Sequence, residues 1–164
     1  SKDIDIIVDF EVLDELRKKY PVKKTQFLKK YEAIIHDTAV DIYVPFYSEF
    51  AIPPEEIQKS TIKIEGFKVP EPEILLILKQ QAELARRYSV KGQKDRVDIL
   101  NILMNSNVDL KRYLELIEKF NIPLYKDRLK EIVAAASKEF QYLGIQNPRQ
   151  IKLWKRKIMK KLRS

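Results

Sequence analysis

Two aspartates near the start of the chain have the spacing of a metal-binding pair. Asp3 and Asp5 are separated by one residue and lead into the β-branched run 6–8, so on a strand both carboxylates point from the same face. Asp41, inside the strand-forming run 39–44, would join them if its strand lies alongside. Three carboxylates around one point suit one or two Mg²⁺ or Mn²⁺ ions, which in enzymes most often serve phosphoryl transfer. The alternative is a chance Asp-x-Asp at a strand end, with both side chains in water.

The elements that would position these acids follow from the apolar spacing. Residues 11–20 have apolar side chains at helical spacing and stop before a proline, which indicates a helix directly after the first strand. Two β-prone runs, separated by Asp37-Thr38, predict a hairpin over residues 31–44. Asp41 would lie on the second arm of that hairpin.

The second part of the chain has a different apolar period. A further hairpin is expected around Glu65-Gly66, and from Pro72 onward the period is 3.6, which indicates helices only. The expected helices are 72–88, 95–104, one capped by Asn107 and ending at Phe120, 124–143 closed by Gly144, and a last one after Asn147-Pro148. The expected fold class is therefore α+β, a small mixed β-sheet in residues 1–70 followed by a helical region in residues 71–164.

Composition narrows the chemistry that the chain can perform. With 164 residues, 45% of them apolar, it can form one compact domain or one domain with a helical extension. The absence of cysteine excludes disulfides and thiolate metal sites, and the single histidine, His36, is expected on the surface beside a turn. Any metal must therefore bind oxygen. No run approaches the roughly 20 apolar residues that cross a bilayer, and no signal-peptide core is present, so the expected location is the cytoplasm, without a membrane partner.

The net charge of +8 lies wholly at the C-terminal end. Residues 1–148 carry 24 charges of each sign, whereas eight cations and no acid follow Pro148. Such a segment can bind RNA or another polyanion by counterion release, or it can simply be a solvated helix face. The candidate nucleic-acid-binding residues are Lys155, Arg156, Lys157, Lys160 and Lys161. Trp154 is expected to anchor this helix by packing, with base stacking as the alternative.

A second group of motifs lies in the helical region. Residues 69–79 read Val-Pro-Glu-Pro-Glu-Ile-Leu-Leu-Ile-Leu-Lys, and they are followed by Ala82, Arg86-Arg87 and, over 94–99, Lys-Asp-Arg-Val-Asp-Ile. Together with the three early aspartates, these motifs resemble the polymerase β superfamily of nucleotidyltransferases. They are most similar to its branch of abortive-infection toxin nucleotidyltransferases and related prokaryotic proteins. In that branch an Asp-x-Asp strand, a third strand acid, a Leu-Lys-x-x-Ala helix with Arg, and a Lys-Asp-x-x-Asp helix start follow in this order. The resemblance spans about residues 1–104.

The resemblance implies a nucleotidyltransferase fold and a magnesium-dependent reaction. A nucleoside monophosphate would pass from a nucleoside triphosphate to an acceptor, with release of pyrophosphate. Asp3 and Asp5 would hold Mg²⁺ with the triphosphate, and Asp41 would complete the metal shell and help to activate the attacking hydroxyl. The acceptor is not readable from the sequence: RNA such as a tRNA end, a small molecule and a protein stay open, and the family suggests a cognate antitoxin or other partner protein.

The same resemblance assigns roles in the helical region. Lys79 would contact phosphate, and Asp95 would orient Lys79 or the nucleotide. Asp98 and Arg86 are further candidates for nucleotide binding. Each has a structural alternative, since Lys79 could extend along its apolar stripe and Asp95 could be a helix N-cap. Arg86 could equally form an ion pair or a solvated edge.

One departure from the family pattern bears on activity. The family has a Gly-Ser or Gly-Gly turn upstream of Asp-x-Asp, and the three glycines of this chain, at 66, 92 and 144, do not replace it. We expect a preceding segment of a few tens of residues to carry that turn; the alternative is a remnant fold that has lost catalysis. A remnant would act as an interaction module for nucleic acid or a partner protein. A DNA-binding regulator is a weaker hypothesis, because no helix-turn-helix pattern stands out.

Overall fold

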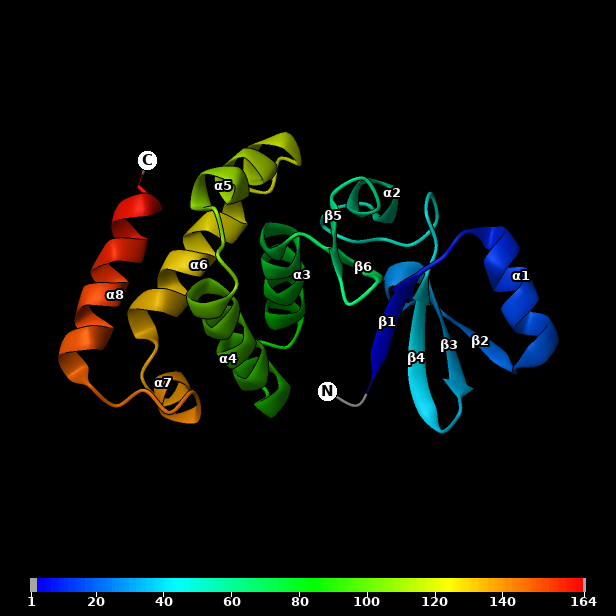
Figure 1. Ribbon diagram of the computed structural model, residues 1–164, viewed down its shortest axis with the longest axis horizontal. Helices are drawn as coiled ribbons and strands as arrows, with labels where there is room; N and C mark the ends of the chain where they lie inside the picture. The colour runs from blue at the N-terminus through cyan, green and yellow to red at the C-terminus, as the bar shows by residue number, and fades with distance from the viewer. Residues whose placement is uncertain (1–2, 164) are drawn as a thin grey trace. The chain divides into compact units, whose positions relative to one another are not determined.

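The computed structural model describes residues 3–163, and the chain divides into two compact units at Val69/Pro70. Residues 1, 2 and 164, which belong to the predicted regions 1–70 and 71–164, lie outside the described residues. The first unit contains a mixed four-stranded sheet and the second contains helices (Figure 1). The expected α+β class, with a small mixed sheet followed by a helical half, is thus confirmed.

The sheet of the first unit has the order β1-β4-β3-β2 (Figure 1). The strands and the helices that connect them are, in chain order, β1 (Ile4–Ile7), α1 (Phe10–Lys19), β2 (Val22–Thr25), the 3₁₀ turn η1 (Phe27–Lys29), β3 (Lys30–Ile35) and β4 (Thr38–Tyr43). Strand β1 is parallel to β4, whereas the β4–β3 and β3–β2 pairs are antiparallel. The strand that carries Asp5 and the strand that carries Asp41 are therefore neighbours.

One face of this sheet packs against α1. Leu13 of α1 is fully buried in a cluster of apolar side chains from β3, β4 and the residue after β4. The cluster also contains Tyr31, Ala33, Val40, Ile42 and Val44. Because side chains alternate along a strand, the intervening residues lie on the opposite face. That face carries the charged side chains described below.

The hairpin between β3 and β4 turns at His36 and Asp37. Both residues have positive φ, 47° and 61°, as a two-residue type I′ turn requires. The hairpin itself was predicted, but its turn lies one residue earlier than expected. His36 is exposed, as expected, and its ring lies 6.3 Å from the ring of Tyr20 in an edge-on arrangement.

A second, two-stranded sheet completes the first unit. It consists of β5 (Thr61–Ile64) and β6 (Phe67–Pro70), preceded by the short α2 (Pro54–Ile57). Glu65 and Gly66 form the turn between the strands with φ of 49° and 86°, which confirms the predicted hairpin at this position.

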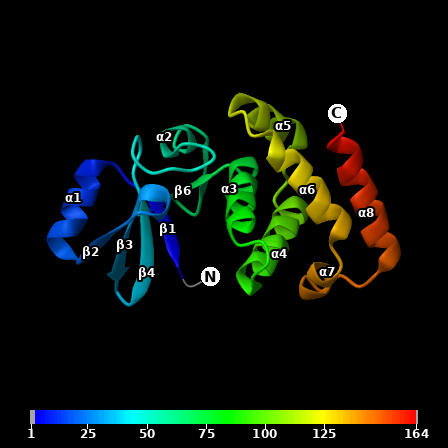
Figure 2. The ribbon, with the colours of Figure 1, turned by 180° about the vertical axis from the view of Figure 1, so that it is seen from behind.

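The second unit consists of helices. They are α3 (Pro72–Ala85), α4 (Val90–Asn105), α5 (Leu110–Lys119), α6 (Pro123–Ala135), α7 (Lys138–Tyr142) and α8 (Pro148–Lys161). Their buried side chains, among them Leu76, Leu100, Tyr113, Leu129 and Phe140, form its core. Helix α8 lies beside α6 in both views (Figures 1 and 2).

Several helix boundaries differ from the predicted ones, and α3 ends at Ala85, three residues before the expected end. Helix α4 begins at Val90 because the Ser89 side chain accepts a hydrogen bond from Gly92 N–H, 3.0 Å away. A Cβ at Gly92 would lie 2.3 Å from the carbonyl oxygen of Arg86, so glycine is required there for close approach and does not end the helix. Asp109, not Asn107, caps α5. The expected helix 124–143 is interrupted at Ala136 and Ser137, where the Glu139 carboxylate accepts a hydrogen bond from Ser137 N–H.

None of the helices within residues 3–163 combines the length and the apolar character that a bilayer crossing requires.

Candidate functional site

Three carboxylates lie in register across the sheet of the first unit. Asp5 of β1 pairs with Asp41 of β4, and Asp41 pairs in turn with Glu32 of β3. Adjacent strands are about 4.8 Å apart, and residues in register share a face. The row lies on the face opposite α1 and includes a residue, Glu32, that the sequence did not single out. Asp3, the other acid of the Asp-x-Asp motif, is exposed just before β1.

A lysine neutralises the centre of this acidic row. Lys30 Nζ lies 2.5 Å from Asp41 Oδ2 and 3.4 Å from Glu32 Oε1, and its side chain is only 13% exposed. Burial acts to lower the pKa of Lys30, but the hydrogen bond and charge of Asp41 outweigh it and the pKa is raised. Lys30 is therefore firmly cationic at neutral pH. The acidic row therefore already binds one cation, the ammonium group of Lys30.

Tyr43 lies at the same part of the sheet. Burial, followed by the negative charges of Asp5 and Asp41, raises the pKa of the Tyr43 hydroxyl well above its usual range. Hydrogen bonding toward the Asp5 side chain contributes to the same rise of the Tyr43 pKa. Since the hydroxyl stays protonated, it is a hydrogen-bond donor beside the Asp5 carboxylate.

The donor atoms of the row fit a hard divalent cation better than any other metal. Carboxylate oxygens are the ligands of Mg²⁺ and Mn²⁺, and the ammonium group of Lys30 stands in for such a cation against Asp41. Within residues 3–163, however, no group of three or more acids or histidines has the arrangement of a formed metal site. A metal at this place would bind Asp5 and Asp41 and would displace Lys30. The three-aspartate site, with Asp3 as the third ligand, stays a prediction.

The candidate nucleotide-binding residues of the second unit form two separate ion pairs. Lys79 Nζ lies 2.8 Å from Asp98 Oδ2, and both side chains are partly exposed. Arg86 makes two bonds to Asp95, of 2.6 and 2.7 Å, and Asp95 is 2% exposed. Asp95 therefore orients Arg86 and not Lys79. The N-cap alternative for Asp95 is also wrong, since this residue lies inside α4.

A buried glutamate forms a network that the sequence did not reveal. Glu83, fully buried in α3, accepts bonds of 3.0 and 2.5 Å from Arg128 and one of 3.1 Å from Arg96. Arg96 also lies 3.3 Å from Glu139, and the hydrogen bonding of Arg128 to the Glu83 carboxylate raises the pKa of Arg128. Both arginines line a hollow of about 530 Å³ near Tyr88. Because acids already bind them, we assign this cluster to the core and not to a ligand.

The basic helix α8 is anchored by its apolar side. The rings of Trp154 and Phe140 meet edge-on with centroids 5.6 Å apart, which confirms the packing interpretation of Trp154. Ile158 and Leu162 are buried, whereas Leu153 is 54% exposed. The helix is thus fixed with one face inward and with most of its cations outward.

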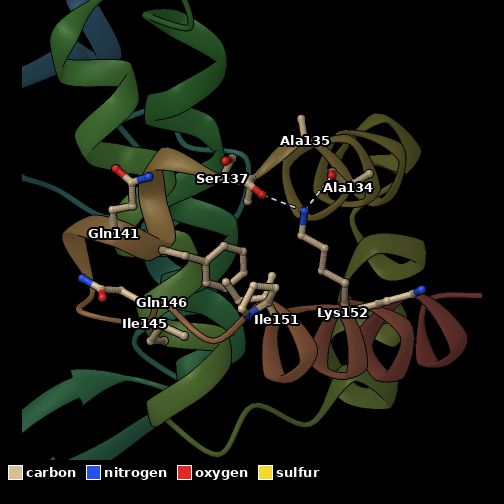
Figure 3. Close-up of a pocket in the computed structure, with 12 residues that line it drawn as sticks. Ala134, Ala135, Ser137, Gln141, Ile145, Gln146, Ile151 and Lys152 are labelled. Carbon is tan, nitrogen blue, oxygen red and sulfur yellow. Dashed lines mark hydrogen bonds between the residues drawn. The ribbon is translucent and has the colours of Figure 1, made fainter.

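Lys155 differs from the other candidate cations of α8. Its Nζ donates to the carbonyl oxygens of Ala134 and Ala136, 2.9 and 2.6 Å away, at the C-terminal end of α6 (Figure 3, dashed lines). Burial lowers its pKa. The side chain lines a hollow of about 780 Å³ that α8 shares with α6 and α7, and it satisfies carbonyls that the helix end leaves open. Lys155 therefore has a packing role, unlike the exposed Arg156, Lys157, Lys160 and Lys161.

Comparisons with protein-family models, with curated proteins and with solved structures found no match to this chain. The fold and the candidate site thus define an α+β protein with an acidic row on a mixed sheet and a basic helix at the end of a helical unit.

Proposed function

We propose that this protein is a magnesium-dependent nucleotidyltransferase of the polymerase β type. It would transfer a nucleoside monophosphate from a nucleoside triphosphate to an acceptor and release pyrophosphate. The observation that supports the proposal most is the register of Asp5 against Asp41 on parallel neighbouring strands. That register places two hard oxygen donors side by side, as metal-assisted phosphoryl transfer needs.

Each residue of the acidic row has a part in this proposal. Asp5 and Asp41 hold the metal, with Asp3 as the further ligand, and Asp41 accepts the hydrogen bond of the attacking hydroxyl. Tyr43 keeps Asp5 oriented. Mg²⁺, when bound with the triphosphate, supplies charge stabilisation as phosphate oxygens become more negative in the transition state.

Lys30 acts as a cation that a metal replaces. Its ammonium group is already within 3.4 Å of Glu32, so it can leave Asp41 without losing all of its negative partners. Released in this way, Lys30 can donate to a phosphate oxygen. A metal that binds Asp41 then exchanges with Lys30 at that carboxylate. Asp41 faces a cation both with and without the metal, so neither state leaves its charge unpaired.

Lys79 is the proposed phosphate contact of the second unit. Its partner Asp98 is about half exposed, and such pairs contribute little to stability. A phosphate group can therefore take the place of Asp98 at little cost. Arg86 and Asp95 are joined by two hydrogen bonds, with Asp95 buried and Arg86 exposed. They support α4 and the turn before it and are not proposed to touch nucleotide.

The test is labelling of an acceptor pool by radiolabelled nucleotide. Wild-type protein with Mg²⁺ or Mn²⁺ and each triphosphate in turn should label an RNA or protein fraction. Asp5→Asn and Asp41→Asn should reduce labelling about 100-fold or more, since each removes transition-state charge stabilisation. Asp37→Asn is the matched control, because it removes a carboxylate from the exposed hairpin turn and should leave labelling intact. Equal labelling by all four proteins would contradict the mechanism.

A second candidate function is favoured by the Lys30–Asp41 pair itself. This pair balances the charge at the centre of the row without any metal, as expected for a non-catalytic remnant that acts as an interaction module. The labelling experiment separates the two candidates. A remnant would show no metal-dependent labelling with any triphosphate, although its basic helix would still bind a partner.

A further inference from the structure

Seven cations form an exposed basic face on and just after α8. They are Arg149, Lys152, Arg156, Lys157, Lys160, Lys161 and Arg163, and all are exposed. Four of them, Arg149, Lys152, Arg156 and Lys160, are separated by steps of three, four and four residues. Residues at these spacings lie above one another on a helix. With a rise of 1.5 Å per residue, the four make a straight row about 16 Å long.

The basic face is not neutralised within the part of the chain that the structure describes. None of its seven cations forms an ion pair there, whereas Arg86, Arg96 and Arg128 of the same unit are each bound by a carboxylate. The sequence explains this difference, because no acid follows Pro148. A row of like charges at i, i+4 spacing destabilises an isolated helix slightly, so the row opposes helix formation. An anion bound from outside the chain would offset this repulsion.

The inward side of α8 fixes how the basic face is presented. Trp154 packs on Phe140, and Ile158 and Leu162 are buried. Lys155 reaches the end of α6, where it donates two hydrogen bonds to carbonyl groups. The helix therefore cannot rotate about its axis without breaking these contacts. The row is a rigid, linear array of positive charge.

We infer that the basic face binds the phosphate backbone of a nucleic acid. A straight row of cations matches a linear polyanion, and each lysine or arginine that meets a phosphate releases a counterion. A membrane is a poorer fit, since a helix on a bilayer inserts apolar side chains and those of α8, apart from Leu153, face its own unit. An acidic protein is also a poorer fit, because protein interfaces need buried anchors and Leu153 is the one large apolar side chain exposed on this helix.

This inference is independent of catalysis. It concerns where a nucleic acid is held, and it stands whether the acidic row binds a metal or not. If the proposed nucleotidyltransferase activity is correct, the basic face makes a nucleic acid the favoured class of acceptor. A binding assay without triphosphate or metal tests it separately from any labelling.

The experiment is a salt titration of binding to defined probes. Fluorescence anisotropy is measured with a labelled 20-nucleotide RNA and with a 20-base-pair DNA duplex between about 50 and 200 mM salt. Four contacts predict a slope of log K against log[salt] of about −3 for the single strand and about −3.5 for the duplex. The relative affinities of the two probes identify the preferred nucleic acid.

Three double variants locate the contacts. Arg156→Gln with Lys160→Gln removes two of the four cations of the row and should make the single-strand slope shallower by roughly 1.4. Lys91→Gln with Lys111→Gln removes the same charge from exposed positions on α4 and α5 and should leave the slope unchanged. The charge-preserving pair Arg156→Lys with Lys160→Arg should behave as wild type.

Two results would overturn the inference. Equal slopes for the row variant and its control would show that net charge alone, and not the basic face, attracts the probe. Tighter binding to vesicles of anionic phospholipid than to either nucleic acid, at matched salt, would assign the face to a membrane surface instead.

Discussion

The two units hold their carboxylates in different ways. In the second unit, Glu83 and Asp95 are buried and each accepts at least two hydrogen bonds from arginine. In the first unit, Asp41 is partly exposed and is held by one lysine, while Asp5 is exposed. Arginine stays charged and donates two parallel hydrogen bonds to a carboxylate. A lysine is a single point charge, which another cation can replace. The difference separates acids that hold the fold together from acids that can take part in binding.

The largest effect should follow from breaking the arginine-held network. Glu83→Gln leaves Arg96 and Arg128 without their buried counter-charge, and we expect the free energy of unfolding to fall by about 3–5 kcal/mol. Asp41→Asn, the matched change in the first unit, should cost only about 1 kcal/mol because Lys30 keeps Glu32. Urea denaturation of both variants measures the two values.

Glu131→Gln serves as the control for that comparison. This exposed acid also binds Arg128 and Arg87, so it tests loss of an arginine partner without loss of a buried charge. Its cost should be much smaller than that of Glu83→Gln, because solvent screens the interactions of an exposed acid. A loss as large as that of Glu83→Gln would show that burial is not what distinguishes the network.

A smaller effect should distinguish the cations of α8 from one another. Lys155→Gln removes two hydrogen bonds to the end of α6 and should lower the free energy of unfolding by about 1–2 kcal/mol. Lys157→Gln, an exposed neighbour, should change it by no more than about 0.5 kcal/mol. Thermal and urea unfolding of the two variants measure these changes. Equal losses of the free energy of unfolding would show that Lys155 has no packing role and is a solvent-facing cation like Lys157.

The smallest predicted effect is a pair of opposite pKa shifts. The pKa of Lys30 is raised, so its contribution to stability is complete below the unfolded pKa and is lost as pH rises through the folded pKa. Burial lowers the pKa of Lys155. Between this lowered folded pKa and the unfolded pKa, the unfolded chain binds more protons than the folded one, so the free energy of unfolding rises with pH in that range. NMR titration of the two side chains between about pH 9 and 12 should place Lys30 above Lys155. The reverse order would contradict both environments.

The sequence predicted the elements of the first unit better than the partners within it. The Asp-x-Asp spacing and the hairpin implied that Asp5 and Asp41 could be neighbours, and β1 and β4 do pair in that register. The turn, however, lies at His36-Asp37, one residue earlier than expected. Moving a hairpin turn by one residue moves each cross-strand partner by two, so Glu32 was not recognised opposite Asp41.

Other parts were not predictable because local signals opposed the structure. Strand β2 consists of Val-Lys-Lys-Thr, and its pairing with β3 outweighs the low strand propensity of lysine. The helix was expected to begin at residue 95, after Gly92, yet the lack of a side chain at Gly92 is what permits the first turn of α4 beside Arg86. The partners of Glu83 are 13 and 45 residues away in the chain, and no local periodicity encodes contacts of that range.

The most direct test of the acidic row as a cation site is a titration with Mn²⁺ in the presence of a nonhydrolysable nucleoside triphosphate. Electron paramagnetic resonance measures the free ion at each step. If Asp5 and Asp41 form the cation site and Lys30 occupies it in competition, wild-type protein binds Mn²⁺, Asp5→Asn binds it at least about tenfold more weakly, and Lys30→Gln binds it more tightly than wild type. Identical Mn²⁺ affinity in all three proteins would show that the acidic row is not a metal site and would contradict the proposed function.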